Sequence, residues 1–143
     1  MADPIEVPKR SLEALNADDW DAFRATFAAD CVLEEFPTGR RLEGPDAVVE
    51  ASQGWKQAFP DLHGVIRNLV ACGSTVTVEV TWEGTHTGDL VSEMGTIPPS
   101  GKRLSVPAVL ISEVEGDKIK ATRDYFDLLT LLTQIGAVPA GAQ

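Results

Sequence analysis

The sequence contains one carboxylate whose surroundings favour acid–base chemistry. Asp124 lies in the segment Thr122-Arg123-Asp124-Tyr125-Phe126-Asp127, among the apolar neighbours of a strand that packs against a core. Strands disfavour aspartate, and charged side chains are rarely buried without a function. Asp124 is therefore a candidate general acid and base that borders a cavity. The alternative is a surface aspartate in a weak ion pair with Arg123.

Two histidines and two glutamates complete the set of candidate acid–base residues. His86 lies in Thr85-His86-Thr87-Gly88, where a strand is expected to open into a loop. Its imidazole could orient a substrate carbonyl or carry a proton near neutral pH, or it could tie the loop to backbone groups. His63 is expected to play the same structural part. Glu34 and Glu35 are adjacent, so on a strand only one of them points inward, and both could also form a solvated strand end.

Metal and cofactor chemistry have little support in the sequence. The only two cysteines, Cys31 and Cys72, form no C-x-x-C motif, and the histidines lack metal-ligand spacing. A dinucleotide fingerprint and a phosphate-binding loop are also absent. We expect no metal, no cofactor and buried thiols.

Length and charge restrict the class of protein further. A chain of 143 residues fits one domain over residues 1–143. The net charge of −10 has the wrong sign for nucleic acid or an anionic membrane surface. No apolar run is long enough for a membrane span, and the start of the chain lacks the features of a signal peptide. A cytoplasmic protein that binds neither nucleic acid nor membrane is expected.

Helical spacing dominates the first part of the chain. Leu12, Leu15 and the aromatic residues from Trp20 to Phe27 predict two helices or one bent helix, with a cap within residues 16–19. Gly44-Pro45 predicts the start of a second helical segment that ends at Phe59-Pro60. A short strand over 31–36 and a return through 40–43 lie between them.

Alternating patterns dominate after Pro60 and predict a sheet. Strands are expected at 62–72, 76–83, 102–115 and 118–126, with a hairpin at 115–117 and a short helix after Asp127 that Gly136 ends. The many glycines and prolines between residues 85 and 101 predict a long loop without regular elements. Strict alternation places Asp124 on the face opposite Ile119, unless a bulge intervenes.

Helices followed by consecutive strands predict an α+β domain, in which helices pack on the concave face of a curved antiparallel or mixed sheet. Five segments, in this order, resemble the SnoaL-like polyketide cyclases of the nuclear transport factor 2-like fold. The resemblance covers nearly the whole chain. The five segments are Ala14-Leu15-Asn16-Ala17-Asp18-Asp19-Trp20, Phe59-Pro60-Asp61-Leu62-His63, Trp82-Glu83-Gly84-Thr85-His86-Thr87-Gly88, Pro98-Pro99-Ser100-Gly101-Lys102 and, near the end, Asp124-Tyr125-Phe126-Asp127 together with Gln134-Ile135-Gly136.

The resemblance implies a cone with an apolar cavity, a homodimer and a small hydrophobic partner molecule. It also implies a cofactor-independent aldol closure of a polyketide ring, in which one carboxylate acts as base and then as acid. The catalytic aspartate of these cyclases matches Asp124. Leu110 stands where family cyclases can carry a histidine, so desolvation by an apolar neighbour would replace the imidazole and raise the pKa of Asp124.

Other functions fit the same fold. The related ketosteroid isomerases suggest Glu35 as a base, but Ser11 and Leu110 are poor oxyanion donors there. A hydrolase, or a binding protein without turnover, could use the same cavity. Trp55, Phe59 and Trp82 suit the wall of a site for a flat substrate. The candidate catalytic residues are Asp124 and His86, and the candidate substrate-binding residues are Glu35, Trp55, Phe59, His63, Trp82, Leu110 and Phe126.

Overall fold

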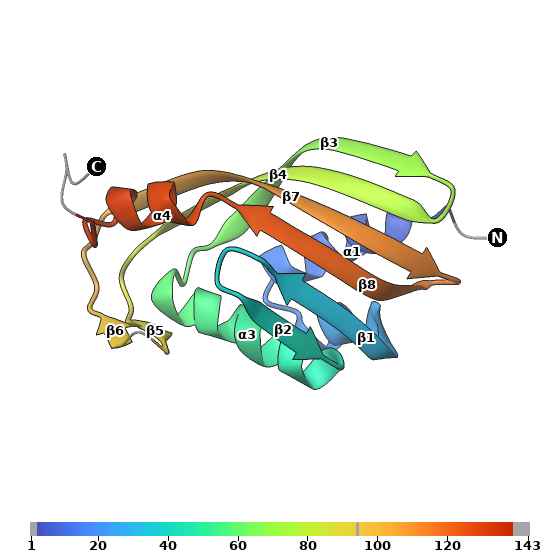
Figure 1. Cartoon of the computed structure of the whole chain (residues 1–143), viewed down its shortest axis with the longest axis horizontal. Helices are drawn as coiled ribbons and strands as arrows, with labels where there is room; N and C mark the ends of the chain where they lie inside the picture. The colour runs from blue at the N-terminus through green and yellow to red at the C-terminus, as the bar shows by residue number, and fades with distance from the viewer. Residues whose placement is uncertain (1–2, 94, 139–143) are drawn as a thin grey trace.

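The computed structural model describes residues 3–93 and 95–138, which fold into four helices and eight strands (Figure 1). The helices are α1 (Glu6–Asn16), α2 (Trp20–Ala25), α3 (Pro45–Ala58) and α4 (Leu128–Gln134). The strands are β1 (Phe27–Glu35), β2 (Arg40–Glu43), β3 (His63–Cys72), β4 (Thr75–Thr85), β5 (Leu90–Ser92), β6 (Gly95–Ile97), β7 (Arg103–Glu115) and β8 (Lys118–Phe126). This arrangement confirms the predicted α+β class.

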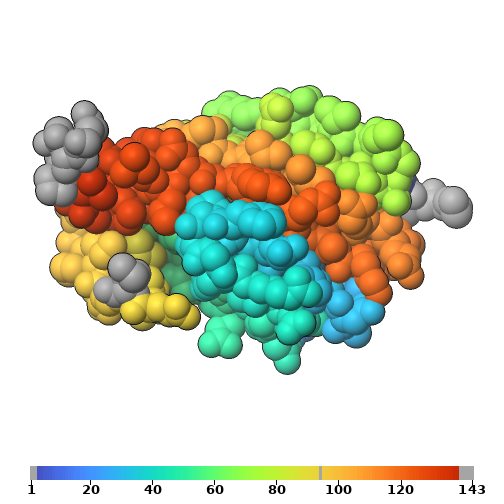
Figure 2. Space-filling model, in the orientation of Figure 1, coloured from blue at the N-terminus to red at the C-terminus, as the bar shows by residue number. Residues whose placement is uncertain are grey.

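Six of these strands form one mixed sheet. Their order is β2-β1-β8-β7-β4-β3, and all neighbours are antiparallel except β1 and β8, which run parallel. The parallel pair brings the first and last long strands of the chain together. In Figure 2 the sheet face in view presents β8 and β7, with β1 and β2 on one side and β3 and β4 on the other.

Helices α1 and α3 lie across the opposite side of the sheet (Figure 1). Asp19 separates α1 from α2, because its side chain accepts a hydrogen bond from the Ala22 N–H at 3.1 Å and so caps α2. Gly44 and Pro45 begin α3, as the sequence predicts, with the proline in the first turn where no N–H is needed. Two helices, rather than one bent helix, therefore precede the sheet.

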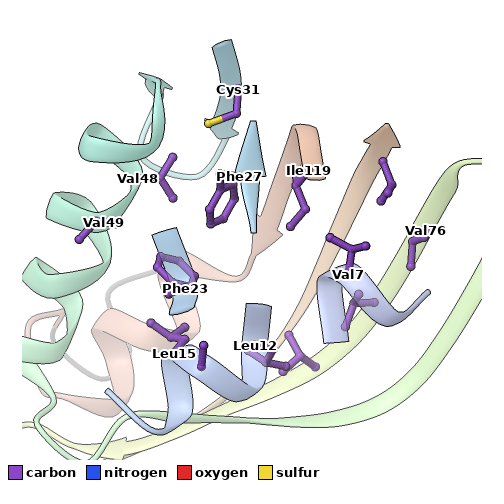
Figure 3. Close-up of a cluster of buried hydrophobic side chains, with 14 of the residues drawn as sticks. Val7, Leu12, Leu15, Phe23, Phe27, Cys31, Val48, Val49, Val76 and Ile119 are labelled. Atoms are coloured by element: carbon purple, nitrogen blue, oxygen red, sulfur yellow. The ribbon is translucent and has the colours of Figure 1, made fainter. Parts of the chain in front are cut away.

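The main core lies between the helices and the sheet. Figure 3 shows Val48 and Val49 of α3 on the side facing Phe23 and Phe27, and Leu12 and the rest of α1 in the same layer. The phenyl rings of Phe23 and Phe27 meet edge to face with centroids 5.0 Å apart. A second buried cluster lies below α4 and the β5–β6 hairpin, and it consists of Ala58, Phe59, Leu62, Leu90, Leu104, Val106, Leu131 and Ile135.

The structure differs from the sequence prediction at two elements. Phe27 begins β1 rather than ending a helix, since its backbone pairs with Ile119 of β8. The segment 85–101 is not entirely irregular, because it contains the β5–β6 hairpin, in which Leu90 pairs with Ile97. Leu90 is buried in the second cluster, and this tertiary contact holds the hairpin in place.

A bulge in β8 determines which of its side chains face the helices. Ile119 pairs with Val114 of β7, and Ala121 pairs with the preceding residue of β7, so Lys120 is an extra residue between them. The bulge reverses the alternation that the sequence predicts. Ile119 and Asp124 consequently lie on the same side of the sheet, and both border the cavity described below.

None of the helices in the described ranges has the length and apolar character needed to cross a membrane.

Candidate functional site

A cavity of about 140 Å³ lies between the helices and the inner face of the sheet. Most of its wall is apolar and comes from α1, α2, α3, α4 and the inward residues of β1, β2, β4, β7 and β8. The polar side chains that border it, apart from the two indoles, are Ser11, Glu35, Ser52, Ser112, Thr122 and Asp124. Few polar groups in an apolar pocket are typical of a small-molecule site, because they can fix the orientation of a ligand.

The sheet register places Asp124 at the centre of one row of inward side chains. Asp124 pairs with Glu35 of β1 on one side and with Leu110 of β7 on the other, and Leu110 pairs in turn with Val78 of β4. All four residues border the cavity. Since side chains directly opposite each other on neighbouring strands lie close together, the carboxyl of Asp124 stands between a second carboxylate and an aliphatic side chain.

Asp124 is partly buried, and one of its carboxylate oxygens is fully enclosed. Its Oδ1 atom is inaccessible to solvent and has no hydrogen-bond partner among the described residues. Burial, followed by the negative charge of Glu35, raises the pKa of Asp124 from 3.8 to about 7, while the positive charge of Arg40 opposes the shift. A carboxyl that titrates near neutral pH can both take up and release a proton under physiological conditions.

Glu35 has the opposite kind of environment. Glu35 is only 4% exposed, and both of its carboxylate oxygens accept hydrogen bonds from side chains. Oε1 accepts hydrogen bonds from the Arg40 Nε–H at 3.0 Å and from the Thr38 hydroxyl, and Oε2 accepts one from the Trp55 Nε1–H at 3.1 Å. Glu35 therefore holds Trp55 and Arg40 in place and is not the free base that an isomerase of the ketosteroid type would need.

Aromatic side chains form part of the cavity wall. Trp55, Trp82 and Phe126 border the cavity. The rings of Trp55 and Phe126 meet edge to face, with centroids 5.8 Å apart and an interplanar angle of 88°. Phe59 does not border the cavity. It is fully buried in the second cluster, where its ring packs against the ring of His86 at a centroid distance of 5.2 Å.

His86 serves the loop that follows it. The residue is fully buried, its Nδ1 accepts a hydrogen bond from the Ser100 N–H at 3.1 Å, and its backbone bonds to Gly101 and Lys102. Because Nδ1 is an acceptor, the ring proton lies on Nε2, which has no partner among the described residues. Burial lowers the pKa of His86 and favours this neutral ring. His86 does not border the cavity.

His63 also lies away from the cavity lining. Its Nδ1 is 3.0 Å from the Asp61 carbonyl oxygen, and its Nε2 is 3.2 Å from a carboxylate oxygen of Glu83. These contacts fasten the start of β3 to the end of β4. No group of three or more His, Cys, Asp or Glu side chains within the described ranges is arranged to hold a metal ion.

Sequence reasoning missed the residues that act through tertiary contacts. Arg40 and Thr38 bind Glu35 across the β1–β2 turn, and nothing in their spacing indicates this. Ser112 and Thr122 face the cavity and hydrogen-bond to each other at 3.0 Å. Ser112 faces inward by the regular alternation of β7, as Leu110 does, whereas Thr122 lies opposite Ser112 and faces inward only because of the bulge at Lys120.

Comparison with known proteins identifies the family of the chain. Residues 5–135 match the family of SnoaL-like polyketide cyclases. Among characterised sequences, the chain is 27% identical to the aklanonic acid methyl ester cyclase DauD of Streptomyces sp. (strain C5), over 95% of this chain and 83% of that protein.

Solved structures share the fold. A candidate SnoaL-like polyketide cyclase from Jannaschia sp. CCS1 superimposes with a TM-score of 0.83 at 24% identity, over 95% of this chain and 93% of the other. A protein with a ketosteroid isomerase-like fold from Catenulispora acidiphila DSM 44928, in complex with trimethylamine, gives a TM-score of 0.79 at 21% identity, over 96% and 97% of the two chains. Since the family match spans nearly all of the sequence, this chain belongs to the SnoaL-like polyketide cyclase family.

Proposed function

We propose that the protein is a cofactor-independent cyclase that closes a ring in a hydrophobic polyketide ester by an intramolecular aldol reaction. The observation that carries the proposal is the carboxyl of Asp124, which borders an apolar cavity, has a pKa of about 7 and finds no hydrogen-bond partner for its Oδ1 in the described part of the chain. The substrate class follows from the likeness to the aklanonic acid methyl ester cyclase. No metal or redox group is needed for this chemistry.

In the proposed reaction, Asp124 acts twice. Its carboxylate first takes a proton from the acidic carbon between two carbonyl groups of the substrate. The resulting carbanion attacks a second carbonyl carbon of the same molecule, so that one C–C bond forms and the C=O π bond breaks. Asp124, now protonated, then gives its proton to the new alkoxide oxygen. The carboxylate is regenerated, and atoms and charge balance.

The neighbours of Asp124 support these two steps differently. Leu110 and the aromatic wall exclude water, which favours the neutral acid. Glu35 contributes a negative charge beside Asp124, and its own hydrogen bonds hold its carboxylate in place. Trp55, Trp82 and Phe126 are proposed to contact the flat face of the substrate. His86 and His63 take no part, because neither borders the cavity.

A second candidate function is binding without turnover. Leu110 favours it, because the aliphatic side chain beside Asp124 stands where family cyclases can carry a histidine. A carrier protein would keep the apolar cavity and the aromatic wall but would not need proton transfer at Asp124. Hydrolysis or isomerisation in the same cavity would again depend on that carboxyl.

Two assays separate these functions. The first follows ring closure of aklanonic acid methyl ester, the compound named for the relative, and the second follows deuterium uptake from D2O at the central carbon of an aromatic β-keto ester. We expect both activities in the wild type and neither in Asp124→Asn, which should still bind the ester. Asp117→Asn, which changes an exposed carboxylate in the β7–β8 turn, is the matched control. Binding by the wild type without either activity would instead favour the carrier.

We also propose that the protein is a homodimer in the cytoplasm, as the family resemblance implies. An exposed aromatic pair on the outer face of the sheet supports a partner surface: Phe36 and Tyr125 are 47% and 42% exposed, and their rings stack with centroids 4.9 Å apart. Light scattering coupled to size-exclusion chromatography should give twice the mass of the chain. A monomeric mass at micromolar concentration would contradict the dimer.

A further inference from the structure

A pair of hydroxyl groups borders the cavity at a distance from the proposed acid–base residue. Ser112 of β7 and Thr122 of β8 are directly opposite each other in the sheet, and their side-chain oxygens lie 3.0 Å apart. They are only 3% and 6% exposed, and both border the cavity. The pair is thus buried in the protein but open to a molecule that enters the cavity.

The hydrogen-bonding capacity of this pair is only partly used. Two hydroxyls have two O–H donors and four lone pairs, and the bond between them uses one donor and one lone pair. Neither hydroxyl has another partner among the described residues. Their sheet neighbours on either side, Leu33 of β1 and Val76 of β4, are aliphatic and offer none. One O–H donor therefore remains for a ligand, together with three lone pairs.

The pair has a defined position relative to Asp124. Thr122 precedes Asp124 by two residues on β8, and both side chains point to the same side of the sheet. Two residues of an extended strand span about 7 Å. Asp124 and the Ser112–Thr122 pair are therefore two polar points, about 7 Å apart, on an otherwise apolar stretch of the cavity floor.

We infer that the Ser112–Thr122 pair is a second subsite, which binds a hydroxyl or carbonyl oxygen of the ligand while another oxygen of the same molecule lies at Asp124. This inference rests on the proposed function, because it assumes that a carbonyl compound occupies the cavity. It defines the substrate class more narrowly: an oxygenated aromatic compound with two oxygen functions on opposite sides of one ring. A hydrocarbon ring with a single carbonyl would leave the subsite unused.

A purely structural role for the pair leads to different expectations. If the hydroxyls served only to hold β7 and β8 together, their removal would destabilise the fold and lower the binding affinity for all ligands equally. If they serve a ligand, replacing both by apolar groups of similar shape should leave stability nearly unchanged or raise it, because a buried donor without a partner disappears. The affinity loss should then be confined to ligands that carry the second oxygen.

The test uses two probes that differ in one oxygen, 4-hydroxyacetophenone and acetophenone. Each has a single ring, which suits a cavity of about 140 Å³, since a cavity of about 150 Å³ in another protein holds benzene. Binding is measured by isothermal titration calorimetry at about pH 5.5, where Asp124 is protonated and can donate to the ketone. The wild type should bind 4-hydroxyacetophenone about ten-fold more tightly than acetophenone, the effect of one added hydrogen bond.

Two variants complete the design. The double variant Ser112→Ala/Thr122→Val should bind both probes with the acetophenone affinity and should unfold in urea no more easily than the wild type. Thr122→Ser keeps the hydroxyl and should keep the preference. Equal binding of the two probes by the wild type, no binding of 4-hydroxyacetophenone, or a preference that persists in the double variant would overturn the subsite. This test measures binding and not turnover. A wild type without deuterium uptake or ring closure would therefore count against the cyclase proposal and not against the subsite.

Discussion

Replacement of Asp124 by asparagine should make the protein more stable at alkaline pH, and the size of the effect follows from its environment. In the folded protein the pKa of Asp124 is about 7, against 3.8 in the unfolded chain. The folded state therefore binds this proton more tightly than the unfolded state does. Stability is lost as the pH rises from about 4 to about 7, and the loss is constant above that.

The magnitude can be worked out from the two pKa values. A difference of about 3 pKa units corresponds to about 4 kcal/mol at the alkaline plateau. Between pH 5 and pH 8 the penalty grows by about 2.5 kcal/mol. Asparagine has nearly the same shape and carries no charge, so Asp124→Asn abolishes this part of the pH dependence and leaves the other titrating groups in place.

The assay is equilibrium unfolding in urea at several pH values, on the wild type, Asp124→Asn and Asp117→Asn. The difference in unfolding free energy between Asp124→Asn and the wild type should increase by about 2.5 kcal/mol from pH 5 to pH 8. The same difference for Asp117→Asn should stay constant, because that side chain lies in an exposed turn. Parallel pH curves for the wild type and Asp124→Asn would refute the assignment of Asp124 as a buried carboxyl with a raised pKa.

Three further predictions concern the surroundings of this residue and the loop that covers the second cluster. Glu35→Gln removes a negative charge beside Asp124, so the pKa of Asp124 should fall and the pH midpoint of deuterium uptake should move to lower pH. An unchanged midpoint would contradict the electrostatic role of Glu35. Leu110→His places an imidazole opposite Asp124, and the protonated imidazole should lower the pKa of the Asp124 carboxyl. NMR titration of the carboxyl carbon would detect this change as a shift of the titration midpoint. In Gly88→Ala the added methyl group would lie 1.9 Å from a backbone oxygen at the end of α3, so the loop must move, and thermal unfolding should reveal a loss of about 1–3 kcal/mol. Gly54 lies in α3, and its added methyl group would meet no atom within 4 Å apart from its chain neighbours and the nearby helix backbone, so Gly54→Ala should be neutral or stabilising. Equal losses in both variants would argue against the steric explanation.

The sequence predicted the elements of this fold better than the exact faces of its strands. Alternating residues in β4 and the glycine-proline start of α3 are local signals, and the structure places both elements as expected. The extra residue Lys120 has no local signal, because it depends on how β8 registers with two neighbouring strands. Strict alternation consequently separated Asp124 from Ile119, although both border the cavity.

The candidate site shows the same division between local and tertiary information. Residue type and family resemblance are enough to propose Asp124, Trp55 and Trp82 as site residues, and all three border the cavity. The hydrogen bonds that occupy Glu35 cross a turn and reach a helix, so no spacing in the sequence predicts them. The aromatic side chain of Phe59 favours a place in the cavity wall, but an aromatic ring serves a dry core equally well, and Phe59 packs in the second cluster.

The parallel pairing of β1 with β8 has a consequence for how the protein acquires its site during synthesis. Glu35 and Asp124 are neighbours in the sheet but lie far apart in the sequence, and β8 leaves the ribosome after the other strands that the structure describes. Helices α1 to α3 and the β3–β4 hairpin can form earlier from contacts nearer in sequence, whereas the pocket floor must wait for one of the longest loop closures among the described residues. A chain that stalls or is truncated before β8 therefore has an open apolar surface in place of a cavity, and a ligand can stabilise only a chain that includes β8.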